Sequence, residues 1–380
     1  VYKRQAYSIE TINRNLPIWS SYEPGSTFKI LTLSAALNEG KVNLFEDTYY
    51  DTGGIKVGGS TLHCWKAGGH GFETFLEVVE NSCNPGFVVL SNKLGKETLF
   101  NYIDKFGFGK KTGIDLNGES KGIIFSLDKV GPLELATTGF GQGVSVTAIQ
   151  QVTAVSAIVN NGNMYTPFVV KSISDYETGT ILKETTPTLK SKNLITKETS
   201  DMVKYALESV VANGSGHNAY IEGYRIGGKT GTAQKVGSDG KYMIGNYILS
   251  FIGFMPANDP EYVVYIAIDG AKGATQYGGS TSAPIAKSIF NSIISLYDLK
   301  STTNGMPREY FWYETKYVTV PDVRGLSLKE AKTLLTGFNL EYTGSGKTVV
   351  ITNPEPGKRV KEGSLVKLSL IHISEPTRRS

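Results

Sequence analysis

Three short motifs in the sequence combine residue types that suit acyl transfer on a serine. Residues 26–29 (STFK) have the form S-x-x-K, residues 82–84 (SCN) the form S-x-N, and residues 229–232 (KTGT) the form K-T-G-T. A serine hydroxyl becomes a strong nucleophile when a neighbouring base removes its proton. A lysine lodged among apolar groups has a lowered pKa and can be that base. The motifs together predict nucleophilic catalysis through a serine.

The first motif stands at the start of an apolar segment. Residues 22–25 (YEPG) are a turn signal, and apolar residues follow at helical spacing until Gly40. We expect an amphipathic helix that begins at Ser26 and carries Lys29 on the same face. The positive N-terminus of this helix would favour an alkoxide on Ser26. Further S-x-x-K matches lack this context, and they lie at 126–129, 238–241 and 364–367.

Ser82 and Asn84 of the second motif lie between apolar stretches of the chain. A polar triplet in such surroundings has a structural cost unless it is used, so we interpret both residues as part of the site. Another S-x-N sequence, at 191–193, lies in a polar stretch without apolar framing.

The third motif lies in a segment with strand character. Lys229 and the hydroxyls of Thr230 and Thr232 would present cationic and hydrogen-bonding groups to the anionic end of a substrate. The same strand edge can supply a backbone N–H for an oxyanion hole. Gly231 lets another backbone approach closely. A second K-T-G sequence, at 111–113, lies in a glycine-rich loop.

The elements around the motifs indicate an α+β class. Helical patterns come first, followed by strands and a last helix. The turn at 256–260 joins two of the strands as a hairpin, and the glycine-rich run at 213–216 is expected to be mobile. The predicted helices lie at 73–94 with a break near Pro85, 144–159, 197–211 and 283–297, and the predicted strands at 224–233, 247–254 and 262–268.

The sequence predicts a main domain over residues 6–298, a polar linker over 299–317 and a small domain over 318–370. The small domain combines strands at 318–323, 347–352 and 365–370 with a helix at 327–335, which Ser327 caps with Glu330 at the capping-box position. Residues 1–5 and 371–380 match neither neighbouring pattern, and we interpret the tail 371–380 as artefactual.

Composition excludes several classes of function. The 380 residues carry a net charge of +4 without a basic block, so we expect no nucleic-acid partner. No apolar run reaches the roughly 18 residues that a membrane-spanning helix needs. His63, His70 and His217 lack carboxylate or cysteine partners at ligand spacing, so we expect no metal and no cofactor.

Longer stretches resemble known families. Residues 22–29 (YEPGSTFK), 140–143 (FGQG) and 227–234 (GGKTGTAQ) resemble the class B penicillin-binding proteins over roughly residues 14–298. Residues 320–325 (VPDVRG) and 354–357 (PEPG) resemble a PASTA domain. Residues 64–71 (CWKAGGHG) together with 82–85 (SCNP) look like a class B enzyme of endospore-forming bacteria.

The resemblance implies a penicillin-binding or serine β-lactamase-like transpeptidase fold, with helices around an antiparallel sheet, followed by a small α+β PASTA domain. Members of the family carry a membrane anchor, a pedestal and the first sheet strands before S-x-x-K. We therefore expect the N-terminal anchor, the pedestal and two strands of a five-stranded sheet to be absent from this chain.

The resemblance also implies a D,D-transpeptidase that cross-links peptidoglycan stem peptides. Ser26 would attack the D-Ala-D-Ala amide, Lys29 would take its proton, and Ser82 would relay a proton to the leaving amine. Asn84 would hydrogen-bond the peptide, and Lys229 with both threonine hydroxyls would hold the terminal carboxylate. The N–H groups of Ser26 and Thr232 would form the oxyanion hole.

The partners implied are peptidoglycan stem peptides, β-lactam antibiotics that acylate Ser26, a membrane glycosyltransferase and wall-assembly proteins. The implied location is the bacterial cell membrane with the catalytic domain outside the cytoplasm, in spore-cortex or septal wall synthesis. The alternatives are a serine β-lactamase, whose class A pattern E-x-x-L-N we do not find, and a β-lactam sensor or scaffold without turnover. For the PASTA-like domain, a passive spacer and a ligand-binding module are both open.

Cys64 and Cys83 have two interpretations. Free cysteines are often small, buried and inert. Outside the cytoplasm disulfides persist, and a Cys64–Cys83 bond would pin the loop that carries Ser82 until it is reduced. Sequence alone leaves both open, because it does not show whether the two Cα atoms lie within about 7 Å of each other.

Overall fold

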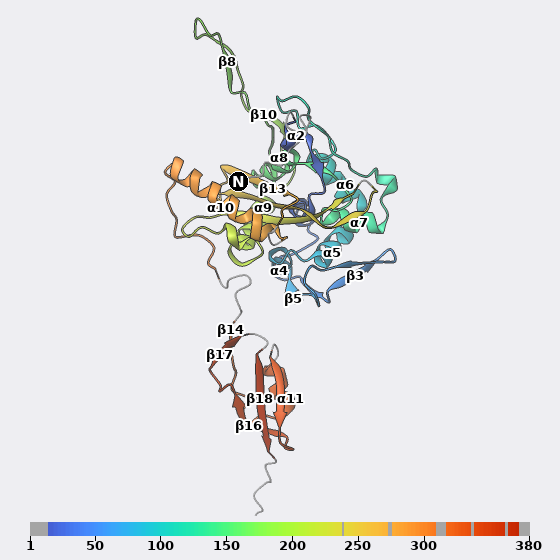
Figure 1. Ribbon diagram of the computed structural model, residues 1–380, viewed down its shortest axis with the longest axis vertical. Coiled ribbons are helices and arrows are strands. Elements are labelled where there is room, and N and C mark those ends of the chain that lie inside the picture. The colour runs from blue at the N-terminus through green and yellow to red at the C-terminus, as the bar shows by residue number, and fades with distance from the viewer. Residues whose placement is uncertain are drawn as a thin grey trace, which may run out of the picture. The chain divides into compact units, whose positions relative to one another are not determined.

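The structure is a computed structural model that describes residues 14–237, 239–272, 276–308, 317–335, 338–361 and 364–371. The chain divides into two compact units, the first of which ends at Arg308, and each is described by itself (Figure 1). Within the described ranges, no helix is long and apolar enough to cross a membrane. Residues 1–5, part of the predicted linker (309–316) and most of the predicted tail (372–380) lie outside these ranges.

An antiparallel sheet of three strands forms the centre of the first unit. Its order is β11 (Gly227–Val236), β12 (Tyr242–Met255) and β13 (Tyr262–Asp269), so β11 is an edge strand among the described residues. The predicted strands and hairpin are confirmed, although β12 begins earlier than the apolar pattern indicated. The helix α10 (Gly278–Leu296) packs on this sheet (Figure 1).

The alternation of side chains along β12 explains why both faces of the sheet are covered. Phe251 and Met255 belong to the apolar cluster that includes Phe290 of α10. Ile252 and Phe254 point to the other face and join the main core of the unit. Successive strand residues face opposite sides, so this pattern requires an apolar partner on each side.

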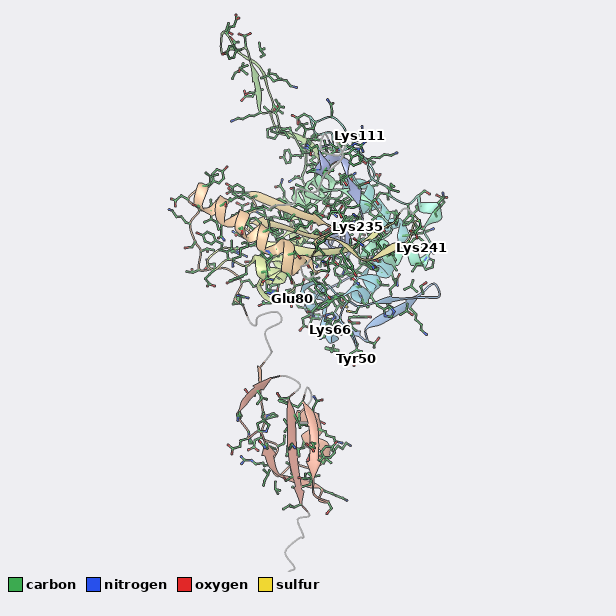
Figure 2. The ribbon with its side chains drawn as sticks, viewed as in Figure 1. Tyr50, Lys66, Glu80, Lys111, Lys235 and Lys241 are labelled. Atoms are coloured by element: carbon green, nitrogen blue, oxygen red, sulfur yellow. The ribbon has the colours of Figure 1, made fainter. Side chains whose placement is uncertain are left out.

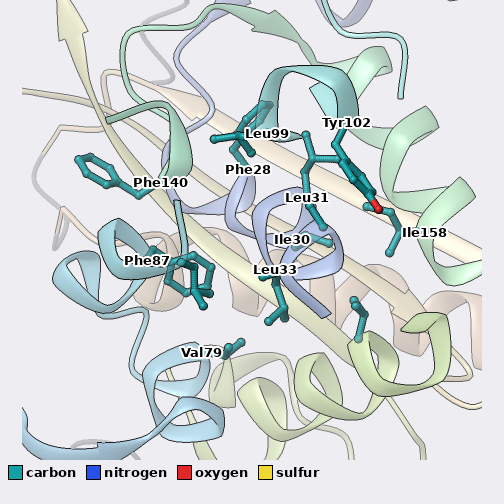
Figure 3. Close-up of a cluster of buried hydrophobic side chains, with 14 of the residues drawn as sticks. Phe28, Ile30, Leu31, Leu33, Val79, Phe87, Leu99, Tyr102, Phe140 and Ile158 are labelled. Carbon is teal, nitrogen blue, oxygen red and sulfur yellow. The ribbon is translucent and has the colours of Figure 1, made fainter. Parts of the chain in front are cut away.

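The helix α3 (Lys29–Asn38) runs through the main core. Every residue from 29 to 36 is buried, so the expectation of an amphipathic helix is wrong, and α3 is covered on all sides. It also begins at Lys29, because residues Gly25–Thr27 form a separate 3-10 turn. Figure 3 shows this core, in which Ile30, Leu31 and Leu33 of α3 lie among side chains that include Phe28, Phe87 and Ile158.

The other helices of the first unit surround α3 and the sheet. The predicted break near Pro85 falls at residues 81–83, and Pro85 lies in the first turn of α5, where proline is tolerated. The sequence did not predict α6 or α7. The bounds are α2 (Leu16–Trp19), α4 (Phe75–Glu80), α5 (Asn84–Leu94), α6 (Lys96–Lys105), α7 (Pro132–Gly139), α8 (Ala148–Val159) and α9 (Lys197–Asn213).

Short strand pairs complete the first unit. They pair β1 with β6, β2 with β5, β3 with β4, β7 with β10, and β8 with β9, all antiparallel. Their bounds are β1 (Ser21–Tyr22), β2 (Thr48–Asp51), β3 (Gly54–Val57), β4 (Ser60–His63), β5 (Gly71–Thr74), β6 (Val146–Thr147), β7 (Met164–Thr166), β8 (Ser172–Ser174), β9 (Ile181–Glu184) and β10 (Thr188–Ser191).

The second unit is a small α+β fold with its own core of aliphatic residues. Ser327 caps its helix in a capping box with Glu330, as predicted. Strand β15 pairs parallel with β18, and β18 pairs antiparallel with β16. The bounds are β14 (Tyr317–Thr319), α11 (Leu328–Leu334), β15 (Asn339–Thr343), β16 (Thr348–Asn353), β17 (Arg359–Lys361) and β18 (Leu365–Ile371).

Candidate active site

Ser26 lies in the 3-10 turn that precedes α3, and it is half-buried. The turn is held from both sides. The Gly25 N–H donates to the Gly141 carbonyl oxygen at 2.9 Å, and a Cβ on Gly25 would lie 3.2 Å from the Thr232 carbonyl oxygen. Gly25 has φ +56°, which favours glycine. The F-G-Q-G segment and the edge strand β11 therefore fix the position of Ser26.

Glu23 connects the same segments by hydrogen bonds. Its Oε1 accepts the Gly143 N–H at 2.8 Å, and its carboxylate accepts the Tyr242 hydroxyl at 3.1 and 3.2 Å. Burial raises the pKa of Glu23, and these two hydrogen bonds oppose the rise. The glutamate before Pro-Gly-Ser thus ties the serine turn to the loop after α7 and to β12.

Lys29 is buried at the centre of the site, and its exposed fraction is 1%. Its Nζ donates to the Ser82 carbonyl oxygen at 2.8 Å, to Ser82 Oγ at 3.2 Å and to Asn84 Oδ1 at 2.7 Å. Burial lowers the pKa of Lys29 to about 7, against the opposing effect of Cys83, Cys64 and Glu73. The amine is therefore a base near neutral pH. Its hydrogen bonds join the first motif to the second.

The second motif occupies the break between α4 and α5. Ser82 is buried and has φ 54°, a left-handed conformation that is uncommon for a residue with a Cβ. Asn84 begins α5, and its Nδ2 donates to the His63 carbonyl oxygen at 3.2 Å. The asparagine is thus oriented by Lys29 on one side and by β4 on the other.

The third motif lies on β11, as predicted. Lys229 is buried, and burial together with the charge of Lys29 lowers its pKa well below the ordinary value. A Cβ on Gly231 would lie 2.2 Å from Ser250 Oγ and 3.0 Å from the Thr27 methyl group, so only glycine fits between β12 and the serine turn. The strand can therefore lie directly against the turn that carries Ser26.

Two residues of this site were not found from sequence. Ser215 Oγ lies 3.2 Å from Thr230 Oγ1, and the Gly278 N–H donates to Thr232 Oγ1 at 3.3 Å. The Ser215 N–H donates to the Glu80 carbonyl oxygen at 2.9 Å, which ties the 213–216 run to α4. The run gave only a turn signal, because its partners are distant in the sequence.

The cysteines and His70 form a cluster beside the second motif. The expectation that His70 lacks cysteine and carboxylate partners is wrong. Its Nδ1 lies 3.3 Å from Cys64 Sγ and 2.9 Å from Asp51 Oδ2, and Cys83 Sγ lies 3.4 Å from the same oxygen. Both cysteines are free and buried, and their sulfur atoms lie within 4.8 Å of each other. The Cys64–Cys83 disulfide remains a prediction.

The second K-T-G sequence has a structural role. The Thr112 N–H and hydroxyl both donate to the buried Glu119 carboxylate, at 2.6 and 2.5 Å. At this copy of the motif, the threonine that could bind a substrate carboxylate is therefore already hydrogen-bonded to a carboxylate of the chain itself.

Comparisons with known proteins identify the family. The penicillin binding protein transpeptidase domain matches residues 2–291, and the PASTA domain matches residues 318–370. The chain therefore belongs to the penicillin-binding protein transpeptidase family and carries a PASTA domain after the transpeptidase domain. The fold expected from the motifs is confirmed at this level.

Individual relatives refine the comparison. Stage V sporulation protein D of Bacillus subtilis is 54% identical over 371 residues, which are 98% of this chain and 57% of that protein. Penicillin-binding protein PbpB of Mycolicibacterium smegmatis is 32% identical, and the aligned region covers 75% of this chain and 45% of that protein. The chain spans about half the length of the curated relatives it matches.

Solved structures show the same fold. A crystal structure of penicillin binding protein 3 from a Mycobacterium, complexed with ampicillin, matches with a TM-score of 0.71 at 29% identity. The match covers 77% of this chain and 66% of the chain in that structure. The transpeptidase domain of penicillin-binding protein 3 from Burkholderia pseudomallei has a TM-score of 0.68 at 26% identity, covering 78% of this chain and 85% of its own.

Proposed function

We propose that this chain is a serine D,D-transpeptidase that cross-links peptidoglycan stem peptides through an acyl-enzyme on Ser26. The observation that carries the proposal is the position of Lys29. A buried amine with a lowered pKa lies one turn after the serine and donates to both polar residues of the second motif. Several isolated matches to short patterns would not produce this convergence.

The proposed reaction has two steps. Ser26 Oγ attacks the carbonyl carbon of the penultimate D-Ala, and its proton passes to Lys29 Nζ. The amide C–N bond breaks, and the leaving amine takes a proton through Ser82 Oγ, which lies 3.2 Å from Lys29 Nζ. An amine of a second stem peptide then attacks the ester, and Ser26 regains its proton.

Substrate binding falls to Asn84 and to strand β11. Burial and the charge of Lys29 lower the pKa of Lys229, and an arriving carboxylate would favour the charged amine and accept a charge-assisted hydrogen bond from it. Thr230 and Thr232 add hydroxyl donors beside it. The N–H groups of Ser26 and Thr232 would stabilise the oxyanion, and each such donor contributes about 3–4 kcal/mol to lowering the barrier.

The biological setting of the proposal is the synthesis of the spore cortex or the septal wall, outside the cytoplasmic membrane. It is supported by the relative named stage V sporulation protein D and by those named peptidoglycan D,D-transpeptidase. In that compartment the proposed partners are a membrane glycosyltransferase and wall-assembly proteins, and the PASTA domain is proposed to act as a spacer. The Cys64–Cys83 disulfide is proposed to form there under oxidising conditions.

The test is labelling with a fluorescent penicillin, followed by a donor–acceptor assay with a stem peptide and a free amine. We expect stable label on the wild type, none on Ser26→Ala, and full label on Ser126→Ala, which alters the exposed serine of another S-x-x-K sequence. Stable label with peptide turnover supports the transpeptidase. Rapid release of hydrolysed penicillin would instead indicate a β-lactamase, and stable label without peptide turnover would indicate a sensor or scaffold.

A further inference from the structure

Four potential ligands converge beside the second motif from separate parts of the chain. Asp51 ends β2, Cys64 directly follows β4, His70 directly precedes β5, and Cys83 lies between α4 and α5. One donor atom from each residue lies within 4.8 Å of all the others. Tyr50 and Lys66, which are labelled in Figure 2, belong to the segment that supplies the first three ligands. The pairings β2–β5 and β3–β4 bring this segment together.

The distances are close to, and partly shorter than, those between the ligands of a tetrahedral metal ion. Zinc lies about 2.3 Å from thiolate sulfur and about 2.0–2.2 Å from nitrogen and oxygen ligands, so the edges of its coordination tetrahedron are about 3.4–3.8 Å long. The corresponding separations here are 3.3 Å from Cys64 Sγ to His70 Nδ1, 2.9 Å from His70 Nδ1 to Asp51 Oδ2, and 3.4 Å from Cys83 Sγ to Asp51 Oδ2. Small movements would accommodate the ion.

Two contacts in this cluster compete for one ring nitrogen. His70 Nδ1 holds either one proton or one lone pair, yet it lies within hydrogen-bonding distance of both Cys64 Sγ and Asp51 Oδ2. Asp51 Oδ2 is in turn approached by the sulfur of Cys83. A cation at the centre would accept a lone pair from every one of these atoms at once.

Burial and charge also favour a cation. The Asp51 side chain is 0% exposed and the His70 side chain 4%, and a second buried carboxylate, Glu73, lies 3.9 Å from His70 Nδ1. Two carboxylates in a buried space are unfavourable unless positive charge compensates them. A divalent ion supplies that charge.

We propose that Asp51, Cys64, His70 and Cys83 form a structural zinc site. Two thiolates favour zinc over magnesium or calcium, which prefer oxygen ligands. Four protein ligands close the coordination sphere, so the ion holds structure and has no open position for catalysis. This site does not depend on the proposed transpeptidase activity, because it concerns metal binding alone.

Cys83 gives the site a consequence for the second motif. It is the residue between Ser82 and Asn84, so coordination of its sulfur would fix the backbone that carries both polar side chains. The same two sulfur atoms cannot bind zinc and form a disulfide at the same time. Zinc and the Cys64–Cys83 bond are therefore alternative states of one pair of cysteines.

The test measures metal content on the whole chain, purified with a phosphine reductant that does not bind zinc and then dialysed. We expect elemental mass spectrometry to find about one zinc ion per chain, because a closed four-ligand site binds one ion. Zinc content should fall to near zero in Cys64→Ser and in His70→Ala. The matched control is His63→Ala, which removes an exposed histidine on the neighbouring strand and should retain zinc.

Cobalt replacement guards against variants that fail to fold. The wild type is stripped with a chelator, checked for native circular dichroism, and loaded with Co²⁺. We expect visible d–d bands of tetrahedral intensity and a thiolate-to-cobalt charge-transfer band, which excess Zn²⁺ removes. A folded wild type with two titratable thiols that takes up neither metal would overturn the proposal, as would retention of zinc by both ligand variants. Penicillin labelling of the same samples reports on the acyl-transfer function separately.

Discussion

If Lys29 is the base for acylation, the rate should depend on pH in a way set by its burial. Burial lowers the pKa of Lys29 to about 7 from the ordinary 10.5. The neutral fraction is then about 0.1 at pH 6, about 0.5 at pH 7 and about 0.9 at pH 8. Acylation should therefore rise about tenfold from pH 6 to pH 8 and level off above that. A lysine with an ordinary pKa would instead give a rate that keeps rising about tenfold per pH unit up to pH 9.5.

Other titratable groups face the amine and must be separated from it. Cys83, Cys64 and Glu73 raise the pKa of Lys29, and Lys229 has a lowered pKa of its own. Because penicillin carries a carboxylate, loss of charge on Lys229 at alkaline pH should weaken binding and add a falling limb. Arginine stays charged, so Lys229→Arg should remove this alkaline fall and leave the acid limb in place.

The assay is the second-order rate constant of acylation by a fluorescent penicillin, measured across about pH 5.5–9.5 under reducing conditions. The matched variant is Lys29→Arg, whose guanidinium cannot act as a base at these pH values. It should acylate slowly and without the break near pH 7. A wild-type rate that climbs through pH 9 without levelling would refute the argument, as would a break near pH 7 that survives in Lys29→Arg.

Three further substitutions test the contacts around the site. Gly231→Ala should slow acylation at least about tenfold and lower the free energy of unfolding by about 1–3 kcal/mol through overpacking. Gly305→Ala is the control and should change neither quantity, because a Cβ there would meet only one side-chain atom, at 3.7 Å. Penicillin labelling and urea unfolding measure the two effects. Ser215→Ala should lower the acylation rate constant about fivefold through loss of about 1 kcal/mol of hydrogen bonding, and an unchanged rate would exclude its role. Arg225→Met should cost about 2–3 kcal/mol in urea unfolding, because the buried Glu208 loses its bidentate partner.

The catalytic motifs could be found from sequence because their chemistry is local. Ser26 and Lys29 are three positions apart, and the turn before them and the apolar run after them are visible in the same stretch. The strand character around Lys229 was equally local, and β11 carries the motif as predicted. Local patterns also gave α9, α11 and the hairpin at Pro256.

Sequence reasoning failed where a residue's neighbours come from distant segments. Helix α3 looked amphipathic, yet it is buried on all sides, because the elements that cover its polar positions are contributed by later parts of the chain. Ser215 reaches Thr230 only after α9 and β11 have packed. No spacing rule links such residues.

His70 illustrates the same limit for ligand patterns. Metal sites are commonly found from pairs of ligands at short fixed spacing. Here the spacings from Asp51 to Cys64 and from His70 to Cys83 are long, because strand pairing, and not one loop or one helix, brings the ligands together. A search restricted to short spacing therefore passes over this cluster.

The state of the cysteines should affect acylation although neither sulfur belongs to the catalytic groups. Ser82 has φ 54°, and a residue with a Cβ in that conformation costs about 1–2 kcal/mol unless its surroundings hold it. Lys29 holds Ser82 through two hydrogen bonds, and Cys83 anchors the next residue in the ligand cluster. Acylation should be fastest with zinc bound, slower after chelation, and different again after oxidation of the thiols by diamide. Equal rates in the three states, each verified by metal and thiol content, would mean that Lys29 alone fixes the position of Ser82.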